Sequence, residues 1–303
     1  MTEIQRYLAE EIAEDHADGF VSRREALRRL GLLGLSGAAA VSLLAAAVAD
    51  QAKAVARKPA AEPAAEPHSV LAEEAAVATR EITFRGPGGR TLMGAWGAAK
   101  RPRGGVLVIH ENRGLNDSIR SVAGRLAASG YSALAIDLLS EEGGTGSFAD
   151  EFEAMAALGA VPPSRFVADM KAGVTELRRR LPKKNVAATG FCFGGGMTWL
   201  LLASKEARLA AAVPFYGTFP DGGNLSGAKA AVLGIYAELD SRVNATRSAA
   251  RTALRKAGVK HSIVTYPGVD HAFFNPTSSR YDRAAATVAY RRMISWFDKY
   301  VAT

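Results

Sequence analysis

The sequence contains a single cysteine, Cys192, among its 303 residues. No disulfide can therefore form within the chain. The sequence also lacks any cluster of histidine, cysteine and aspartate residues at metal-ligand spacing, so neither a metal nor an organic cofactor is expected. With 48% hydrophobic residues, the chain is long enough for one large α/β domain with additional segments.

The formal charge of +8 is the usual reason to suspect nucleic-acid binding, but two features oppose that interpretation. The basic residues are dispersed, and the densest run, residues 178–184, falls at the end of a predicted helix, where cations complement the helix dipole. The aromatic residues do not alternate with basic ones as a platform for stacked bases requires. No nucleic-acid partner is expected.

The first 49 residues have the pattern of an export signal. Arg23 and Arg24 precede an apolar stretch, residues 30–49, which is diluted by glycine, serine and alanine and ends in Ala-Val-Ala. This resembles a twin-arginine signal, which serves proteins that fold before export. It predicts a periplasmic or extracellular protein that contacts the export machinery through residues 22–49 and the membrane only through this segment. The alternatives are an ordinary amphipathic helix and a membrane anchor retained over residues 30–49.

The composition of the following residues predicts a linker and then the folded domain. Residues 50–69 are rich in alanine, proline, lysine and glutamate, with Pro59, Pro63 and Pro67 evenly spaced. This is typical of an extended linker. The catalytic domain is predicted over residues 70–303.

Within that domain, predicted strands alternate with predicted helices. An antiparallel hairpin opens the domain around the turn Gly86–Gly89, and continuous apolar runs follow that are typical of strands buried on both faces. The pattern indicates an α/β fold whose doubly wound, mostly parallel sheet has helices on both faces. A loop is predicted over Leu138–Leu158, at the rim of a site. The predicted strands are 80–84, 91–96, 105–110, 131–137, 186–189, 209–216, 230–236 and 261–266, and the predicted helices are 118–129, 162–181, 244–257 and 281–300.

One stretch, Asn185–Gly196, combines a strand, a sharp turn and a helix start, with Cys192 at the apex. Its G-x-C-x-G pattern has the form of a nucleophile elbow, with cysteine in place of the more usual serine. The glycines suit a strained turn whose flanking side chains would collide with neighbouring backbone. The helix that follows directs its positive end at the sulfur and favours the thiolate. The alternative is a buried structural cysteine in a glycine-rich turn.

Ligands of doubly wound sheets bind beyond the carboxyl ends of the strands. The polar residues at or just after the ends of predicted strands are Glu111, Asp137, Cys192, Asp240 and His271. Three of them occur in the chain order nucleophile, acid, base, which is the order of the α/β-hydrolase fold. Cys192 would attack a carbonyl, His271 would take the thiol proton, and Asp240 would orient the imidazole.

Other residues complete or compete with this assignment. The backbone N–H groups of Phe193 and Asn112 are placed to form an oxyanion hole. Asp270 is the rival acid, Asp240 has the alternative role of a helix N-terminal residue, and Asp137 is expected to anchor a loop. His110 is expected to be structural and His261 to lie at the surface, while His16 and His68 fall outside the domain.

The domain resembles the dienelactone hydrolase family, whose type activity is carboxymethylenebutenolidase. The resemblance covers roughly residues 80–300 and is carried by three motifs and by Asp240 after its strand. The motifs are Gly190-Phe-Cys-Phe-Gly-Gly195, Asp169-Met-Lys-Ala-Gly-Val174 and Pro267-Gly-Val-Asp-His-Ala-Phe273. It implies a triad of Cys192, Asp240 and His271. It also implies that Glu111 holds the resting cysteine and helps to generate the thiolate when substrate binds.

The sequence departs from the family pattern at the residues that bind a substrate carboxylate. Asn275 stands where the type enzyme has an arginine, four residues after the histidine, and a second such arginine has no clear counterpart. Arg113, Arg165 and Arg280 are the candidate replacements. The prediction is a hydrolase that cleaves a small-molecule ester or lactone through a thioester. A broad-specificity carboxylesterase or thioesterase is the alternative, and a non-catalytic binding domain with a redox-sensitive cysteine is the alternative from another class.

Overall fold

The computed structural model describes residues 1–56 and 76–303, and it divides into two compact units. The helical unit comprises Met1–Glu73 together with Phe148–Pro163. The sheet unit comprises Glu74–Ser147 and Ser164–Thr303. The helical unit thus includes a segment that lies, in the chain, between two parts of the sheet unit.

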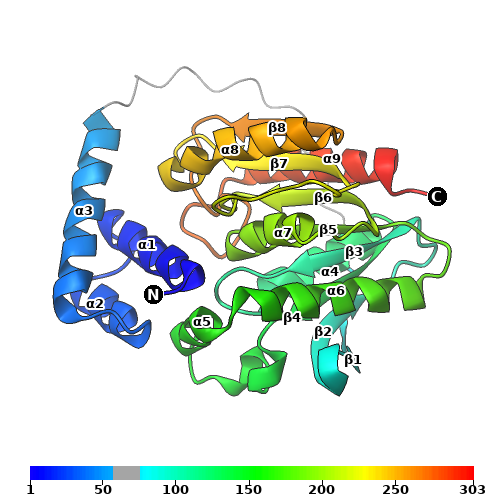
Figure 1. Ribbon diagram of the computed structural model, residues 1–303, viewed down its shortest axis with the longest axis horizontal. Coiled ribbons are helices and arrows are strands. Elements are labelled where there is room, and N and C mark those ends of the chain that lie inside the picture. The colour runs from blue at the N-terminus through cyan, green and yellow to red at the C-terminus, as the bar shows by residue number, and fades with distance from the viewer. Residues whose placement is uncertain (57–75) are drawn as a thin grey trace. The chain divides into compact units, whose positions relative to one another are not determined.

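The described residues of the sheet unit form an eight-stranded sheet in the order β1-β2-β4-β3-β5-β6-β7-β8 (Figure 1). The pairs β1–β2 and β2–β4 are antiparallel, and all the other neighbouring pairs are parallel. The predicted hairpin and the mostly parallel sheet are therefore confirmed. The strands are β1 Arg80–Arg85, β2 Thr91–Gly97, β3 Gly104–Ile109, β4 Tyr131–Asp137, β5 Val186–Phe191, β6 Leu209–Phe215, β7 Ala231–Ala237 and β8 His261–Tyr266.

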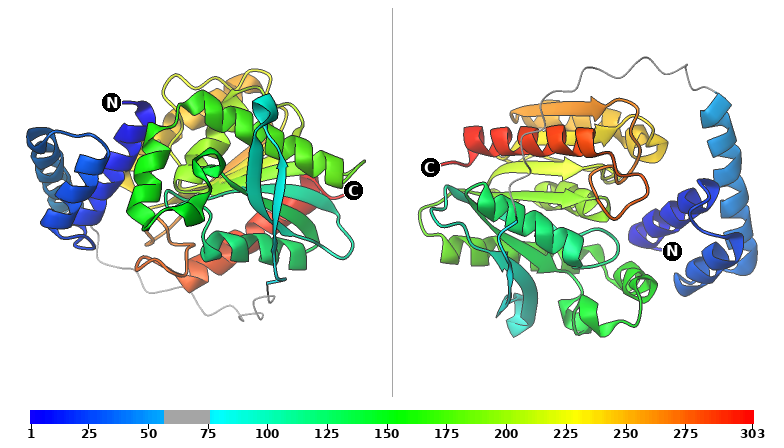
Figure 2. Two further views of the ribbon diagram at one scale, coloured as in Figure 1. Left: turned by 90° about the horizontal axis from the view of Figure 1, so that it is seen from below. Right: turned by 180° about the vertical axis from the view of Figure 1, so that it is seen from behind.

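Helices cover both faces of this sheet, as predicted. Helices α6, α7 and α8 lie on the face toward the viewer in Figure 1, and α4 and α9 lie on the opposite face, which Figure 2 shows from behind. The arrangement is that of an α/β-hydrolase fold. The helices are α4 Asp117–Ala128, α6 Pro163–Arg180, α7 Phe193–Ala203, α8 Ser241–Ala257 and α9 Arg283–Tyr300.

The central strands carry the core because they have apolar residues on both faces. Every residue of β3, β4, β5 and β7 is buried. Helices on each side exclude water from these strands, so continuous rather than alternating apolar sequence is required. The outer strand β8 is mostly half-buried, in keeping with its single neighbour in the sheet.

The helical unit contains α1 (Glu3–Ala17), α2 (Arg23–Leu32), α3 (Gly37–Ala56) and α5 (Glu151–Ala160). Arg23 and Arg24 are exposed at the start of α2, where Ser22 accepts a hydrogen bond from the Glu25 N–H. The guanidinium of Arg29 lies 3.3 Å from the ring centroid of Phe152, so α2 packs on α5. Among the described residues, no helix combines the length and the apolar character needed to cross a membrane.

Helix α5 begins at Glu151 and occupies the last part of the predicted Leu138–Leu158 loop, and that part of the prediction is wrong. The signal was present, since Asp150 caps the helix by accepting hydrogen bonds from the backbone N–H groups of Phe152 and Glu153. The glycines and acidic residues of 141–149 favoured a loop, and the prediction extended that loop over the apolar run that follows them. The predicted linker over residues 50–69 is described only in part. Helix α3 continues into it as far as Ala56, and the rest, 57–69, lies outside the described residues.

Candidate active site

Cys192 lies at the sharp turn between β5 and α7, in the positive-φ conformation that an elbow requires (φ 56°, ψ −119°). Its N–H donates to the carbonyl of Phe215 on the neighbouring strand β6. A Cβ on Gly190 would come within 2.1 Å of the Gly194 carbonyl oxygen, and one on Gly194 within 2.3 Å of the Ile109 carbonyl oxygen. The predicted role of these glycines is confirmed, because any side chain there would collide with backbone.

His271 and Asp240 follow β8 and β7 respectively, and the structure brings them together. The Nδ1 atom of His271 lies 2.6 Å from Oδ2 of Asp240, and both side chains are buried. A ring nitrogen of His271 lies within 4.8 Å of the Cys192 sulfur. The other oxygen of Asp240, Oδ1, accepts a hydrogen bond from the Val243 N–H and caps α8. Asp240 therefore contacts the imidazole and also caps α8, so its two oxygens have different partners.

Asp270, the rival acid, faces a different part of His271. Its Oδ1 atom accepts a hydrogen bond of 2.6 Å from the His271 backbone N–H, and its other oxygen lies 4.0 Å from Nε of Arg280. The imidazole is oriented by Asp240. Because Asp240 occupies Nδ1, the Nε2 atom is the one left for exchange of protons with sulfur and substrate.

The electrostatics of the pair favour a charged imidazole. Burial alone would lower the pKa of His271, but the negative charges of Asp240 and Cys192 and their hydrogen bonds raise it well above the ordinary value. Burial would raise the pKa of Asp240, but His271 and Arg242 lower it below its ordinary range. An imidazolium beside the sulfur stabilises the thiolate, which is the nucleophilic form of cysteine.

Glu111 follows β3 and is held by Asn275. The Nδ2 atom of Asn275 donates to Oε2 of Glu111 at 2.5 Å, and both side chains are buried. Oδ1 of the same amide accepts hydrogen bonds from Ser118 Oγ and from the N–H and hydroxyl of Thr277. Three donors on the oxygen fix which way the amide points. Asn275, a candidate for substrate binding, is therefore engaged with Glu111 in this structure.

Replacing Asn275 with aspartate is expected to disturb the site through charge rather than shape. Asn275→Asp would set a second carboxylate against Glu111, and two carboxylates at that distance cannot both be ionised at neutral pH. We expect kcat/KM for an ester to fall at least about tenfold at pH 7, since one pKa unit corresponds to a tenfold change in the ionised fraction. A pH–rate profile measures the effect.

The control for this variant is Asn224→Asp, which makes the same change at an exposed position in the loop after β6. It should behave as wild type. If Asn275→Asp keeps the wild-type rate and profile, then the hydrogen bond between Asn275 and Glu111 has no part in activity.

The loop after β3, which carries Glu111, Asn112 and Arg113, is tied to the end of β4. The Nε2 atom of His110 accepts from the Leu138 N–H, and its Nδ1 lies 2.6 Å from the Glu111 carbonyl oxygen, so Nδ1 carries the proton. Burial lowers the pKa of His110, which keeps the ring neutral. His110 is structural, as expected.

Asp137 anchors the neighbouring loop, as predicted. Its carboxylate accepts hydrogen bonds from the N–H groups of Leu139 and Thr145 and from the Thr145 hydroxyl. That hydroxyl in turn accepts from the Leu115 N–H. These bonds fix the segment that contains Asn112, whose N–H, with that of Phe193 at the first position of α7, is the predicted oxyanion hole.

The candidate arginines lie in different surroundings. Arg165 of α6 donates to Glu141, to Glu142 and to the Leu138 carbonyl, so its guanidinium is engaged with the loop after β4. Arg280 lies beside Asp270, and Arg113 lies in the loop between β3 and α4. A substrate carboxylate would have to compete with two glutamates for Arg165.

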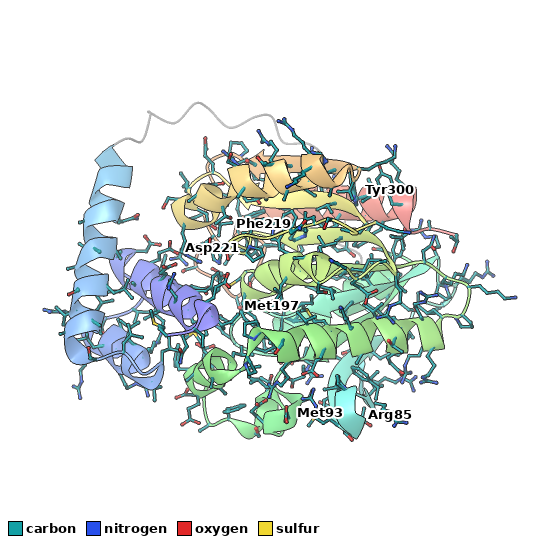
Figure 3. All side chains as sticks on the ribbon, viewed as in Figure 1. Arg85, Met93, Met197, Phe219, Asp221 and Tyr300 are labelled. Atoms are coloured by element: carbon teal, nitrogen blue, oxygen red, sulfur yellow. The ribbon has the colours of Figure 1, made fainter. Side chains whose placement is uncertain are left out.

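Aromatic rings pack the histidine segment against the elbow. Phe274 stacks on Phe191 at 4.9 Å between ring centroids and lies 5.1 Å from Phe215. Phe219, labelled with Met197 in Figure 3, meets Trp199 of α7 edge-on at 5.3 Å. Ser118 and Thr277 were not predicted from the sequence, because their contacts with Asn275 depend on tertiary structure. Tyr216 was not predicted either, although it directly follows β6, at the same edge of the sheet as the other site residues.

Known proteins resemble this chain in sequence and in fold. A family model described as "Dienelactone hydrolase family" matches residues 93–301. An Escherichia coli O157:H7 protein named "Putative carboxymethylenebutenolidase" is 35% identical over 208 residues, covering 64% of this chain and 76% of its own length. "Protein usf" of Aquifex pyrophilus is 32% identical over 213 residues, covering 65% and 88%. The crystal structure of a "Putative Dienelactone Hydrolase" from Klebsiella pneumoniae subsp. pneumoniae MGH 78578 superposes with a TM-score of 0.62 at 29% identity, covering 74% of this chain and all of the other.

Proposed function

Because the chain belongs to the dienelactone hydrolase family, we propose that it cleaves the ester or lactone bond of a small molecule with Cys192 as the nucleophile. The protein is a hydrolase of this family, and the proposal concerns the bond, the nucleophile and the route. The observation that carries it is the placement of three side chains. Cys192 is at a strained elbow, a His271 ring nitrogen is within 4.8 Å of its sulfur, and Asp240 is 2.6 Å from the far side of that ring.

The first half of the reaction forms a thioester. The Cys192 proton passes to Nε2 of His271, and the sulfur attacks the acyl carbon of the substrate. The carbonyl oxygen takes the negative charge, which the N–H groups of Phe193 and Asn112 stabilise. The acyl carbon–oxygen bond then breaks, and the imidazolium gives its proton to the departing alkoxide.

The second half hydrolyses the thioester. His271 takes a proton from water, the resulting hydroxide attacks the acyl carbon, and the thiolate leaves as the carboxylic acid is released. Asp240 keeps its negative charge throughout, so it stabilises the imidazolium that forms in each half. Water and substrate supply every atom that the products need, so these side chains suffice for the reaction.

The test is turnover of three substrates by the full-length chain and by Cys192→Ala: a dienelactone, a neutral lactone and a short p-nitrophenyl ester. A lead for the dienelactone would assign the family's type substrate. Turnover of the two neutral compounds alone would favour a broad-specificity carboxylesterase or thioesterase, in keeping with Asn275 at the position of a substrate-binding arginine. If none of the three is cleaved, or if Cys192→Ala cleaves them as well as wild type does, the proposal is wrong.

We further propose that the N-terminal residues direct export by the twin-arginine machinery. Arg23 and Arg24 support this because both side chains are exposed at the start of α2, where a receptor can reach them. Changing both to lysine should retain the charge and abolish export, which cell fractionation would measure. The matched control changes Arg178 and Arg179 to lysine. Equal export of both variants would contradict the proposal.

A further inference from the structure

Tyr216 occupies a fixed position beside the elbow. It directly follows β6, and the preceding residue, Phe215, accepts the backbone hydrogen bond from Cys192. Its backbone has φ 32°, a conformation that a bulky side chain rarely adopts. The next residue, Gly217, packs so closely that a Cβ there would lie 2.1 Å from the Gly196 nitrogen of α7. The backbone thus fixes Tyr216 one residue beyond the strand end that holds the Cys192 N–H.

The ring itself is clamped by neighbours on several sides. It meets the His271 ring edge-on at 5.1 Å between centroids and the Phe273 ring at 5.5 Å. The side chain is fully buried. A tyrosine has only two side-chain torsions, so these contacts determine where its hydroxyl lies.

The hydroxyl makes no hydrogen bond of ordinary geometry to a described residue, although it is buried. Burial raises the pKa of Tyr216 well above its ordinary value, and the nearby negative charges of Glu111, Cys192 and Asp240 raise it further. The Phe274 backbone N–H acts in the opposite direction, so it approaches the phenol oxygen rather than its proton. The phenol therefore remains protonated and can donate.

A buried hydroxyl with no hydrogen bond of ordinary geometry among the described residues is not by itself a functional sign, because Tyr236 has one too. The two residues differ in their surroundings. The charges that act on Tyr236 are those of Arg247, Arg251 and Asp240, whereas Tyr216 also senses Glu111 and Cys192. The Tyr216 hydroxyl stays protonated among anionic groups, and one of these, Cys192, gains and loses its charge in each turnover. The hydroxyl is therefore suited to donate a hydrogen bond to the sulfur each time the sulfur is charged.

We propose that Tyr216 is a further catalytic residue whose hydroxyl donates a hydrogen bond to the sulfur of Cys192 whenever the sulfur is a thiolate. No covalent bond changes at Tyr216, and its proton stays on the phenol oxygen. The hydrogen bond is lost when the sulfur is acylated and forms again when the thiolate leaves. This inference rests on the proposed role of Cys192 as nucleophile.

The test uses the single cysteine of the chain. The rate of alkylation by iodoacetamide, measured against pH, reports the thiolate at Cys192 and at no other residue. Tyr216→Phe removes only the hydroxyl, and the expected result is a shift of the profile midpoint upward by about one to two pH units, the range for a hydrogen bond to a charged group. Tyr236→Phe also removes a buried hydroxyl, and its profile should match wild type.

Two outcomes would overturn the inference. One is a Tyr216→Phe profile that coincides with wild type while circular dichroism shows a folded chain. The other is an equal shift in Tyr236→Phe, which would indicate a general effect of losing a buried hydroxyl. Thiolate absorbance in the ultraviolet against pH gives the same comparison without an alkylating reagent. Failure of the proposed function is distinguishable, because ester turnover by Cys192→Ala would reject the nucleophile whatever the profiles show.

Discussion

Cys192→Ala is expected to abolish ester hydrolysis, with kcat/KM falling by about 10⁴-fold or more, while the fold stays intact. The loss is large because the sulfur forms the bond to the acyl carbon, and no neighbouring side chain at the elbow can take its place. The residual rate would come from the oxyanion donors and from substrate binding alone. Hydrolysis of a p-nitrophenyl ester by purified wild type and variant measures the effect.

The melting temperature of the variant distinguishes loss of catalysis from loss of the fold. Cys192 is a small buried side chain in a positive-φ turn, and alanine fits the same space with one atom fewer. The melting temperature should therefore remain close to wild type. A variant that unfolds would leave the role of the sulfur to be judged from Cys192→Ser, which keeps the geometry and supplies a nucleophile that a base tuned to a thiol activates poorly. A fully active Cys192→Ala would contradict the proposed mechanism.

Asp240→Asn is expected to lower kcat/KM by on the order of 10²–10⁴-fold, because an amide can hold the imidazole in the wrong tautomer and does not stabilise its positive charge. The melting temperature should change little, since the asparagine oxygen can still accept from the Val243 N–H and cap α8. The variant is thus expected to lose activity but not stability, because the two oxygens of Asp240 have different partners.

The pH dependence of this variant follows from the sign of the shift at His271. Asp240 raises the pKa of His271, so wild type keeps its imidazolium to a pH well above the ordinary value of 6.5. Removing that negative charge lowers the pKa, and the alkaline limb of the activity profile should move to lower pH. Asp282→Asn is the control, because Asp282 also caps a helix by accepting from the Ala285 N–H. An unchanged rate in Asp240→Asn would show that Asp240 is only a cap.

The sheet could be predicted from sequence because its signals are local. Gly190 and Gly194 predict the elbow, and the continuous apolar runs of β3, β4 and β7 predict buried parallel strands. Each signal lies within a few residues of the feature that it predicts. Cys192, Asp240 and His271 could be grouped because each follows a strand of the same sheet edge.

The rest of the site depends on contacts between distant parts of the chain. Asn275 and Glu111 are 164 positions apart, and no pattern in either segment indicates that the amide holds the carboxylate. From sequence alone, Tyr216 is an ordinary core residue at the end of a strand. Its contact with the His271 ring is seen only in the folded chain. The grouping of residues 148–163 with the N-terminal helices is likewise a property of tertiary packing. Sequence patterns do not predict these features, because the side chains that form them are brought together only in the folded chain.

Mass spectrometry of enzyme quenched in acid during turnover of a p-nitrophenyl ester tests whether hydrolysis proceeds through an acyl group on Cys192. Asp240→Asn, whose deacylation should be slow, is the variant in which the intermediate should accumulate. We expect a mass increase equal to the acyl group, located on the peptide that contains Cys192 and removed by hydroxylamine, as a thioester is. Active enzyme that never carries an acyl group on Cys192, in wild type or variant, would contradict it.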